Sequence, residues 1–105
     1  MVIVLPACQH EIQRFPGEVR GDLADALARL DAGQSLTLPL SRPMPIIGNS
    51  VHELRLKDRS GVYRIFYVFP GGGVVYVLHA FLKKTQATPK KNLDLARKRL
   101  KELKL

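Results

Sequence analysis

The second half of the chain carries a set of side chains with the chemistry of a phosphate-binding site: Arg55, Arg64, His79, Lys83 and Lys84. A guanidinium group offers a planar fork of donors that fits a phosphate, and a lysine adds a positive point charge. A histidine titrates near neutral pH and can carry a proton to or from a reacting group. Together these residue types predict a site that binds an anion and transfers a proton.

Most of these side chains lie on three segments that the sequence predicts to be strands. The segments are rich in Val, Ile and aromatic residues and are separated by the turn signals DRSG and PGGG: residues 51–57, 62–69 and 74–81. Short polar or glycine-rich links of this kind are typical of antiparallel hairpins. With four-residue loops, Arg64 faces Arg55 on one neighbouring strand and His79 on the other, so the three form a row on one face.

The row of Arg55, Arg64 and His79 is electrostatically unfavourable unless it binds an anion. Opposed like charges destabilise a sheet, and two guanidinium groups about 5 Å apart repel by roughly 3 kcal/mol at an effective dielectric constant near 20. A bound phosphate reverses the sign of this energy. The alternative pairs Arg55 with Glu53 or Asp58 and lets Arg64 cap exposed carbonyl groups. The row and the nearby lysines together favour the anion site.

The opposite face of the same strands is apolar and is predicted to be the core. It collects Leu54, Leu56, Tyr63, Ile65, Tyr67, Leu78 and Ala80. Three aromatic residues of the strands, Tyr63, Phe66 and Phe81, can either stack on nucleobases or pack in this core.

The rest of the chain predicts helices around the sheet. A strand within residues 1–6 precedes two short amphipathic helices, which end at a Pro-Gly pair and at Gly33. Residues 35–50 indicate a loop with at most an edge strand, because the three prolines there exclude a central strand. A last amphipathic helix begins at Pro89. We expect one α+β domain over residues 1–105, with an antiparallel sheet, an N-terminal helical hairpin and a C-terminal helix.

The net charge of +8 is concentrated near the C-terminus. From Lys83 to Leu105, nine Lys or Arg residues stand against two acidic ones, whereas the preceding 82 residues hold eight basic and seven acidic residues. Such asymmetry indicates a nucleic acid or an acidic protein as partner; the alternative is a solvated helix face. The candidate RNA-binding residues are Lys57, Arg59, Lys90, Lys91, Arg97, Lys98 and Lys101.

Cysteine and histidine usage limits the other possibilities. Cys8 is the only cysteine, which excludes an internal disulfide and fits the reducing cytoplasm. No spacing among the histidines and Cys8 resembles a set of metal ligands, so we expect no metal and no other cofactor. The apolar start of the chain is too short for a signal peptide or a membrane span, so we expect no membrane association.

Two stretches of the sequence resemble a known family: ELRLKDRSGVYRIFY and VLHAFLKKTQATPKKNLDLARKRLKEL. They are similar to the phage-derived HigB-like branch of the RelE/ParE toxin superfamily, over residues 51–103. The resemblance implies a RelE-like fold and the toxin of a type II toxin–antitoxin pair. It also implies a metal-independent endoribonuclease that cleaves messenger RNA on the ribosome through the substrate 2′-hydroxyl. The implied partners are messenger RNA, the ribosome and a helix-turn-helix antitoxin.

The resemblance also implies roles for the basic residues. By position, Arg55 and Arg64 grip the scissile phosphate, and Lys83 and Lys84 stabilise the developing charge. A proton would be moved by His79 or by Glu53.

The chain departs from RelE-type sequences at two places. Those sequences carry lysines just before the Leu-Arg pair, where this chain has Val51 and Glu53, and a tyrosine near the start of the last helix, where it has Lys90, Lys91 and Asn92. Two alternatives therefore stay open. One is a non-catalytic relative, either a ParE-like topoisomerase inhibitor or a degenerate toxin that only binds its antitoxin. The other is a basic nucleic-acid-binding module.

Overall fold

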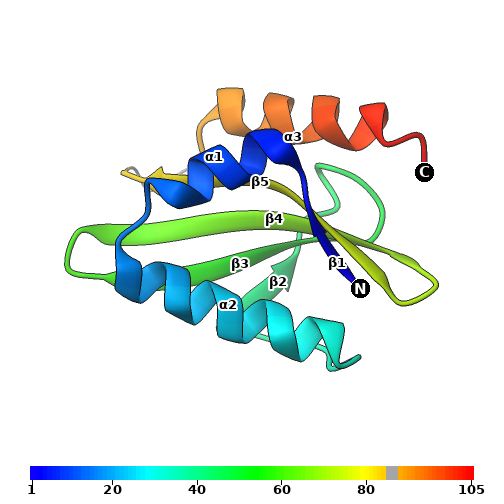
Figure 1. Cartoon of the computed structure of the whole chain (residues 1–105). Helices are drawn as coiled ribbons and strands as arrows, with labels where there is room; N and C mark the ends of the chain where they lie inside the picture. Colours follow the sequence, from blue (N-terminus) through cyan, green and yellow to red (C-terminus); the bar gives the residue numbers. More distant parts are fainter. Residues whose placement is uncertain (85–87) are drawn as a thin grey trace.

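The structure, a computed structural model, describes residues 1–84 and 88–105. Five strands and three helices follow one another in these residues (Figure 1). In chain order they are β1 (Val2–Val4), α1 (Pro6–Gln13), α2 (Gly17–Asp31), β2 (Ser41–Pro43), β3 (Val51–Asp58), β4 (Gly61–Gly71), β5 (Val74–Lys83) and α3 (Lys90–Glu102). The α+β class is therefore confirmed. None of the helices in the described residues is both long and apolar enough to cross a membrane.

The strands form one sheet in the order β1-β5-β4-β3-β2. The pairs from β2 to β5 are antiparallel, as the turns between residues 51 and 81 predict, and β2 is the short edge strand that the prolines allow. β1, however, runs parallel to β5, with Val2 opposite Val75. The sheet is thus mixed, because the chain leaves β1 through two helices and two more hairpins before β5 returns beside it.

Both faces of the sheet are covered (Figure 1). α2 packs on the face of Leu54 and Ile65, whereas α3 packs on the opposite face together with residues of the segment that precedes β3. Gly48 of that segment leaves room for α3, since a β-carbon there would lie 2.5 Å from Leu100 Cδ2. Because β4 is buried on both faces, it is one continuous buried run from Tyr63 to Val68.

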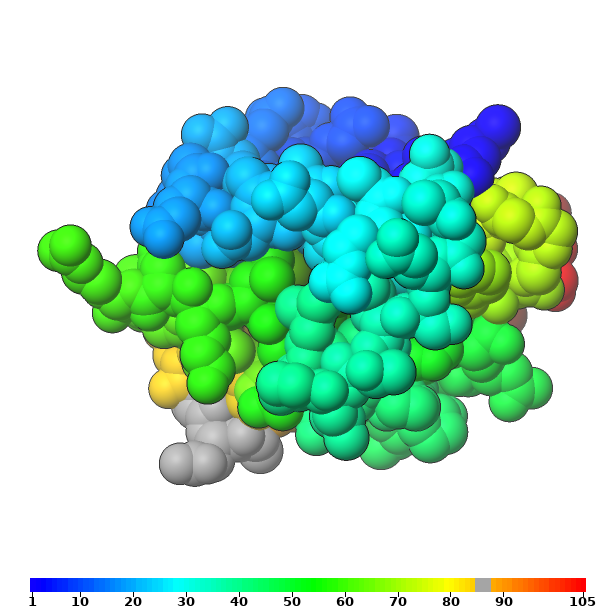
Figure 2. All heavy atoms as spheres, turned by 90° about the horizontal axis from the view of Figure 1, so that it is seen from below, coloured from blue at the N-terminus to red at the C-terminus, as the bar shows by residue number. Residues whose placement is uncertain are grey.

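Seen from the side of α2, the helices α1 and α2 form a continuous cover over one side of the molecule (Figure 2). The turn between β3 and β4 projects beyond this cover, close to the end of β5. Arg55, Arg64 and Lys83 lie at this end of the sheet.

The predicted register is correct for β3 and β4 but wrong for β4 and β5. Arg55 is opposite Arg64, as expected. Arg64, however, faces Phe81, and His79 lies two residues back along β5, opposite Phe66. The hairpin closes through the two-residue turn Gly72-Gly73, whose φ angles of 67° and 74° suit glycine, rather than through the four-residue loop.

A register irregularity also moves Leu78 to the other face. The pairing shifts between Phe66 and Tyr67, which leaves Leu78 as the extra residue on β5. Leu78 consequently packs in the core under α3, and its predicted position beside Leu54 and Ile65 is wrong. His79 still shares the face of Arg64. It lies opposite Phe66, and Phe66 and Arg64 are two residues apart on β4 and therefore on the same face.

Candidate phosphate-binding site

Two rows of side chains lie side by side at the open end of the α3 face. One row is Arg55, Arg64 and Phe81, and the other is Lys57, Val62 and Lys83. Arg42 of the edge strand β2 joins them, because it pairs with Glu53 of β3. We call the five positive side chains the basic face: Arg42, Arg55, Lys57, Arg64 and Lys83.

A buried carboxylate organises the basic face. Glu53 is fully buried, and its Oε1 accepts hydrogen bonds from Arg64 Nη1 at 2.7 Å and from Arg42 Nε at 3.1 Å. Arg64 itself is only 5% exposed. Three further buried polar atoms have no hydrogen-bond partner among the described residues: Glu53 Oε2, Arg55 Nε and Arg64 Nε. Buried polar groups are normally hydrogen-bonded, so the Nε donors of Arg55 and Arg64 each lack an acceptor that an anionic ligand could supply.

The electrostatics of the basic face favour an anion. Burial lowers the pKa of Arg64; Glu53 opposes this shift, and the positive charge of Arg55 adds to it. Burial also lowers the pKa of Lys83, and the charge of Arg64 lowers it further. Each cation is therefore destabilised by its surroundings, and a bound phosphate would relieve that cost.

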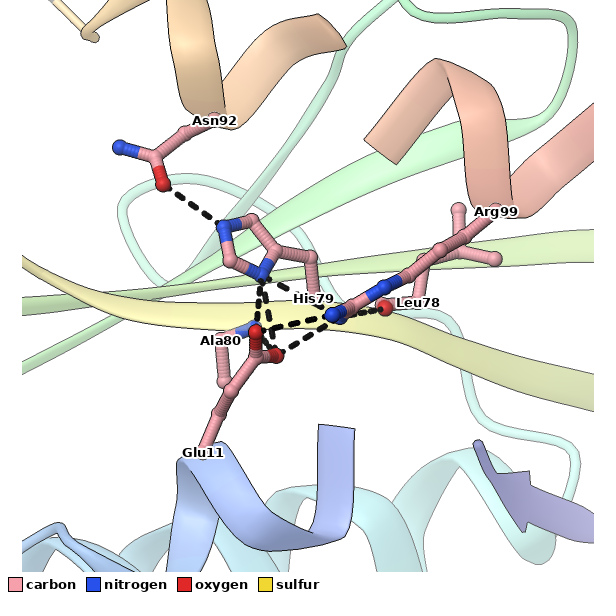
Figure 3. Close-up of polar contacts among 6 residues, drawn as sticks. All are labelled: Glu11, Leu78, His79, Ala80, Asn92 and Arg99. Atoms are coloured by element: carbon pink, nitrogen blue, oxygen red, sulfur yellow. Dashed lines mark hydrogen bonds and ion pairs between the residues drawn. The ribbon is translucent and has the colours of Figure 1, made fainter. Parts of the chain in front are cut away.

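His79 does not point into the basic face but bridges two helices (Figure 3). Its Nδ1 lies 2.9 and 3.0 Å from the two carboxylate oxygens of Glu11 on α1, and its Nε2 lies 2.7 Å from Asn92 Oδ1 on α3. The side chain is buried, with 4% of the residue exposed. Both ring nitrogens are thus occupied by protein groups.

Arg99 of α3 completes this cluster (Figure 3). It donates to both oxygens of Glu11, at 2.8 and 3.1 Å, and to the carbonyl oxygen of the extra residue Leu78 at 2.9 Å. Burial opposes ionisation of Glu11, but hydrogen bonds from His79 and Arg99 outweigh it and lower the pKa of Glu11 to about 2. We call Glu11, His79, Asn92 and Arg99 the buried polar cluster; it ties α1, β5 and α3 together.

Cys8 lies against the same cluster and is fully buried. Burial, followed by the negative charge of Glu11, raises the pKa of its thiol to about 12. The thiol is therefore neutral and is no nucleophile at physiological pH. Within residues 1–84 and 88–105, no three His, Cys, Asp or Glu residues gather as a potential metal site.

Phe81 lies between the basic face and the buried polar cluster. Its ring stacks on His79, with 5.1 Å between centroids and 18° between planes, and it packs at a tilt against Phe66. Phe66 and Tyr63 are core residues. Of the three aromatic residues that could stack on a base, Phe81 is the one that stays partly exposed.

The remaining predicted basic residues lie at the β3–β4 hairpin, just after β5 and on α3. Exposed side chains are Lys57, Arg59, Lys84, Lys90, Lys91, Lys98 and Lys101. Arg97, by contrast, is used in packing: its Nε and Nη2 donate to the carbonyl oxygen of Ile46 at 3.1 and 2.9 Å, and its Nη1 donates to Asp94. The structure therefore groups Arg55, Arg64 and Lys83, and it separates His79 and the far end of α3 from them.

Several residues of these two groups are not evident from the sequence. Arg42 lies beside a proline in a segment without strand character, and only its pairing with Glu53 reveals its position. Glu11 and Arg99 are 88 residues apart. Asn92 is uncharged, so neither charge nor motif singles it out in the sequence. The spacing of two residues between His79 and Phe81 on a predicted strand puts both on one face, and this signal could have identified Phe81 as a neighbour of the site.

A solved structure has a similar fold. The crystal structure of the isolated E. coli RelE toxin, P21 form, matches with a TM-score of 0.57 and 17% sequence identity, over 98% of this chain and 97% of that chain. The chain thus has a RelE-like fold. It belongs to the family described as "Phage derived protein Gp49-like (DUF891)", whose model matches residues 10–101. No curated protein sequence matches it significantly. Residues 85–87, in the middle of the HAFLKKTQATPKK motif, lie outside the described residues.

Proposed function

We propose that this protein is the toxin of a type II toxin–antitoxin pair, of the HigB-like branch, and that it cleaves messenger RNA on the ribosome. The observation that carries the proposal is the pair Arg55 and Arg64, opposed across two strands, with buried Nε atoms that have no partner among the described residues. The family and the RelE-like fold agree with this assignment.

The chemistry uses the substrate's own 2′-hydroxyl as nucleophile. The 2′-oxygen attacks the phosphorus and its proton leaves to solvent, while the bond from phosphorus to the 5′-oxygen breaks. The products are a 2′,3′-cyclic phosphate and a 5′-hydroxyl end. Arg55 and Arg64 hold the non-bridging oxygens, which aligns the attack and stabilises the added charge. Lys83, whose pKa is lowered by burial, gives its proton to the departing 5′-oxygen, and Lys84 adds positive charge.

Glu53 and His79 support this site without touching the RNA. The carboxylate of Glu53 is fully buried and holds Arg64 and Arg42 in place. Both nitrogens of His79 are engaged with Glu11 and Asn92. We therefore assign Glu53 and His79 positioning roles and leave proton donation to Lys83.

The partners follow from the charge. The exposed lysines of α3, with Lys57 and Arg59, would contact phosphates of messenger RNA or of the ribosome. A helix-turn-helix antitoxin with an acidic segment would cover the same surface. The burial of Glu53 and His79 favours one second candidate, a non-catalytic relative that binds its antitoxin and does not cleave RNA.

The test is cleavage by the purified protein of a translated messenger RNA and of an isolated RNA, with EDTA added in the second assay. We expect products with 2′,3′-cyclic or 3′-phosphate ends in both. Arg55→Ala should remove the activity, whereas the matched control Arg29→Ala, an exposed arginine on α2, should retain it. Intact RNA together with growth arrest in cells would instead support a ParE-like inhibitor of a topoisomerase.

A further inference from the structure

We propose that Phe81 is a stacking platform for a nucleobase of single-stranded RNA, next to the phosphate held by Arg55 and Arg64. This inference rests on the proposed function for its substrate, but its experiment does not depend on cleavage. The platform is formed by the face of the ring that His79 does not cover.

The position of Phe81 fits a base beside a gripped phosphate. Phe81 is the residue directly opposite Arg64, and Arg64 is directly opposite Arg55. Neighbouring strands are about 4.8 Å apart, so the ring begins one strand away from the central guanidinium group. A nucleotide whose phosphate lies on the two arginines can thus place its own base, or the next one, over the ring.

His79 covers one face of the Phe81 ring, and the platform would use the other face. His79, Phe81 and Lys83 follow one another on the same side of β5. Because Phe81 stacks on His79 with nearly parallel planes and Lys83 is two residues further on along the same side of β5, we infer that the second ring face is turned toward Lys83. Phe81 is partly exposed, in contrast to the core ring of Phe66.

The buried polar cluster gives the platform its rigidity. His79 is fixed from α1 by Glu11 and from α3 by Asn92, so the surface under Phe81 cannot rotate freely (Figure 3). A ring that is already oriented loses little entropy when a base stacks on it. This arrangement gives the buried histidine a function that needs no proton transfer.

The chemistry predicts a tolerant subsite. Every base has a flat π-face, so stacking on an aromatic ring binds single strands with little preference for sequence. Lys83 beside the ring adds attraction for the backbone without reading a base. We therefore expect any base to be accepted at this position, with purines bound more tightly because of their larger area.

Binding of an uncleavable RNA tests the platform. The probe is a single-stranded oligonucleotide of 2′-fluoro nucleotides, which lacks the nucleophile, with fluorescent 2-aminopurine placed at each position in turn. Stacking on Phe81 should quench one position with the wild-type protein and with Phe81→Tyr, but not with Phe81→Leu. Phe81→Leu should also bind about five- to 150-fold more weakly, the range typical for one stacked base. The matched control Phe69→Leu changes a half-buried phenylalanine that packs with the core on the α2 face, and it should bind like the wild type.

An abasic nucleotide at the quenched position separates stacking from damage to the fold. The wild type and Phe81→Leu should bind the abasic strand equally, because the interacting partner is then missing from both. Equal losses on intact and abasic strands, or no binding of the oligonucleotide by the wild type, would overturn the platform. Cleavage of RNA without a Phe81-dependent quench would reject the platform and keep the proposed function. A Phe81-dependent quench without cleavage of RNA would keep the platform and reject the proposed ribonuclease activity.

Discussion

At the scale of single residues, Glu53 fixes the charge balance of the basic face. Its removal would leave the buried guanidinium of Arg64 without its partner. We expect Glu53→Leu to lower the free energy of unfolding by about 3–5 kcal/mol. The double variant Glu53→Leu with Arg64→Met should recover most of this loss, because neither charge remains. Urea unfolding measures both, and a double variant no more stable than the single one would contradict the pairing.

Lys83 gives a second prediction at this scale. An acid catalyst works in its protonated form, and burial has lowered the pKa of Lys83 from 10.5. Cleavage should therefore decline as the pH rises through that lowered pKa. Lys83→Ala should slow cleavage about 100-fold or more, within the range for general acids. An RNA with a sulfur leaving group at the 5′ position, which needs no proton, should restore the rate. No rescue by sulfur would assign Lys83 to charge stabilisation alone.

At the scale of elements, the basic residues of α3 fall into two groups, those exposed to solvent and those used in packing. Lys98 and Lys101 are exposed, whereas Arg97 holds the carbonyl oxygen of Ile46. We expect Lys98→Ala with Lys101→Ala to reduce the salt dependence of RNA binding by about 1.4 in slope, if each lysine neutralises one phosphate of a single strand. Unfolding should not change. A full salt slope in this variant would make that side of α3 a solvated face.

Arg97 should behave in the opposite way. Arg97→Ala removes two hydrogen bonds to the segment before β3 and the contact with Asp94. The expected loss in free energy of unfolding is about 1–3 kcal/mol, with RNA affinity nearly unchanged at temperatures where the variant is folded. Thermal unfolding and a binding titration on the same preparation distinguish the two roles.

The elements also show where sequence patterns suffice and where they fail. The pairing of β3 with β4 could be predicted because one short polar turn fixes it. The pairing of β4 with β5 could not, since three consecutive glycines allow several turns and a bulge adds one residue. The site follows the same rule: the opposition of Arg55 and Arg64 is local, whereas the contact of His79 with Glu11 spans 68 residues and leaves no periodic signal.

At the scale of the whole molecule, the buried polar cluster makes stability depend on pH. Glu11 has a folded pKa of about 2, below its ordinary value of 4.5. A depressed carboxyl pKa stabilises the fold above the unfolded pKa, and the stabilisation is lost as the pH falls from about 4.5 through 2. Its full size is of the order of 2–3 kcal/mol. Glu11→Gln should flatten the pH dependence of urea unfolding in this window, whereas the exposed Glu18→Gln should not. Identical curves for both variants would contradict this role of the buried polar cluster.

The parallel pairing of β1 with β5 also has a consequence for synthesis on the ribosome. Val2 must wait for Val75 before its strand has a neighbour, and Phe81 and Lys83 follow later still. Contacts between such distant parts of a chain form late and slow the folding of small domains. A growing chain that has just completed β4 therefore carries Arg42, Arg55, Lys57 and Arg64 but still lacks Phe81, Lys83 and the strand that joins β1 to the sheet. The proposed site needs Phe81 and Lys83 of β5, so a copy interrupted before β5 should lack the proposed cleavage activity.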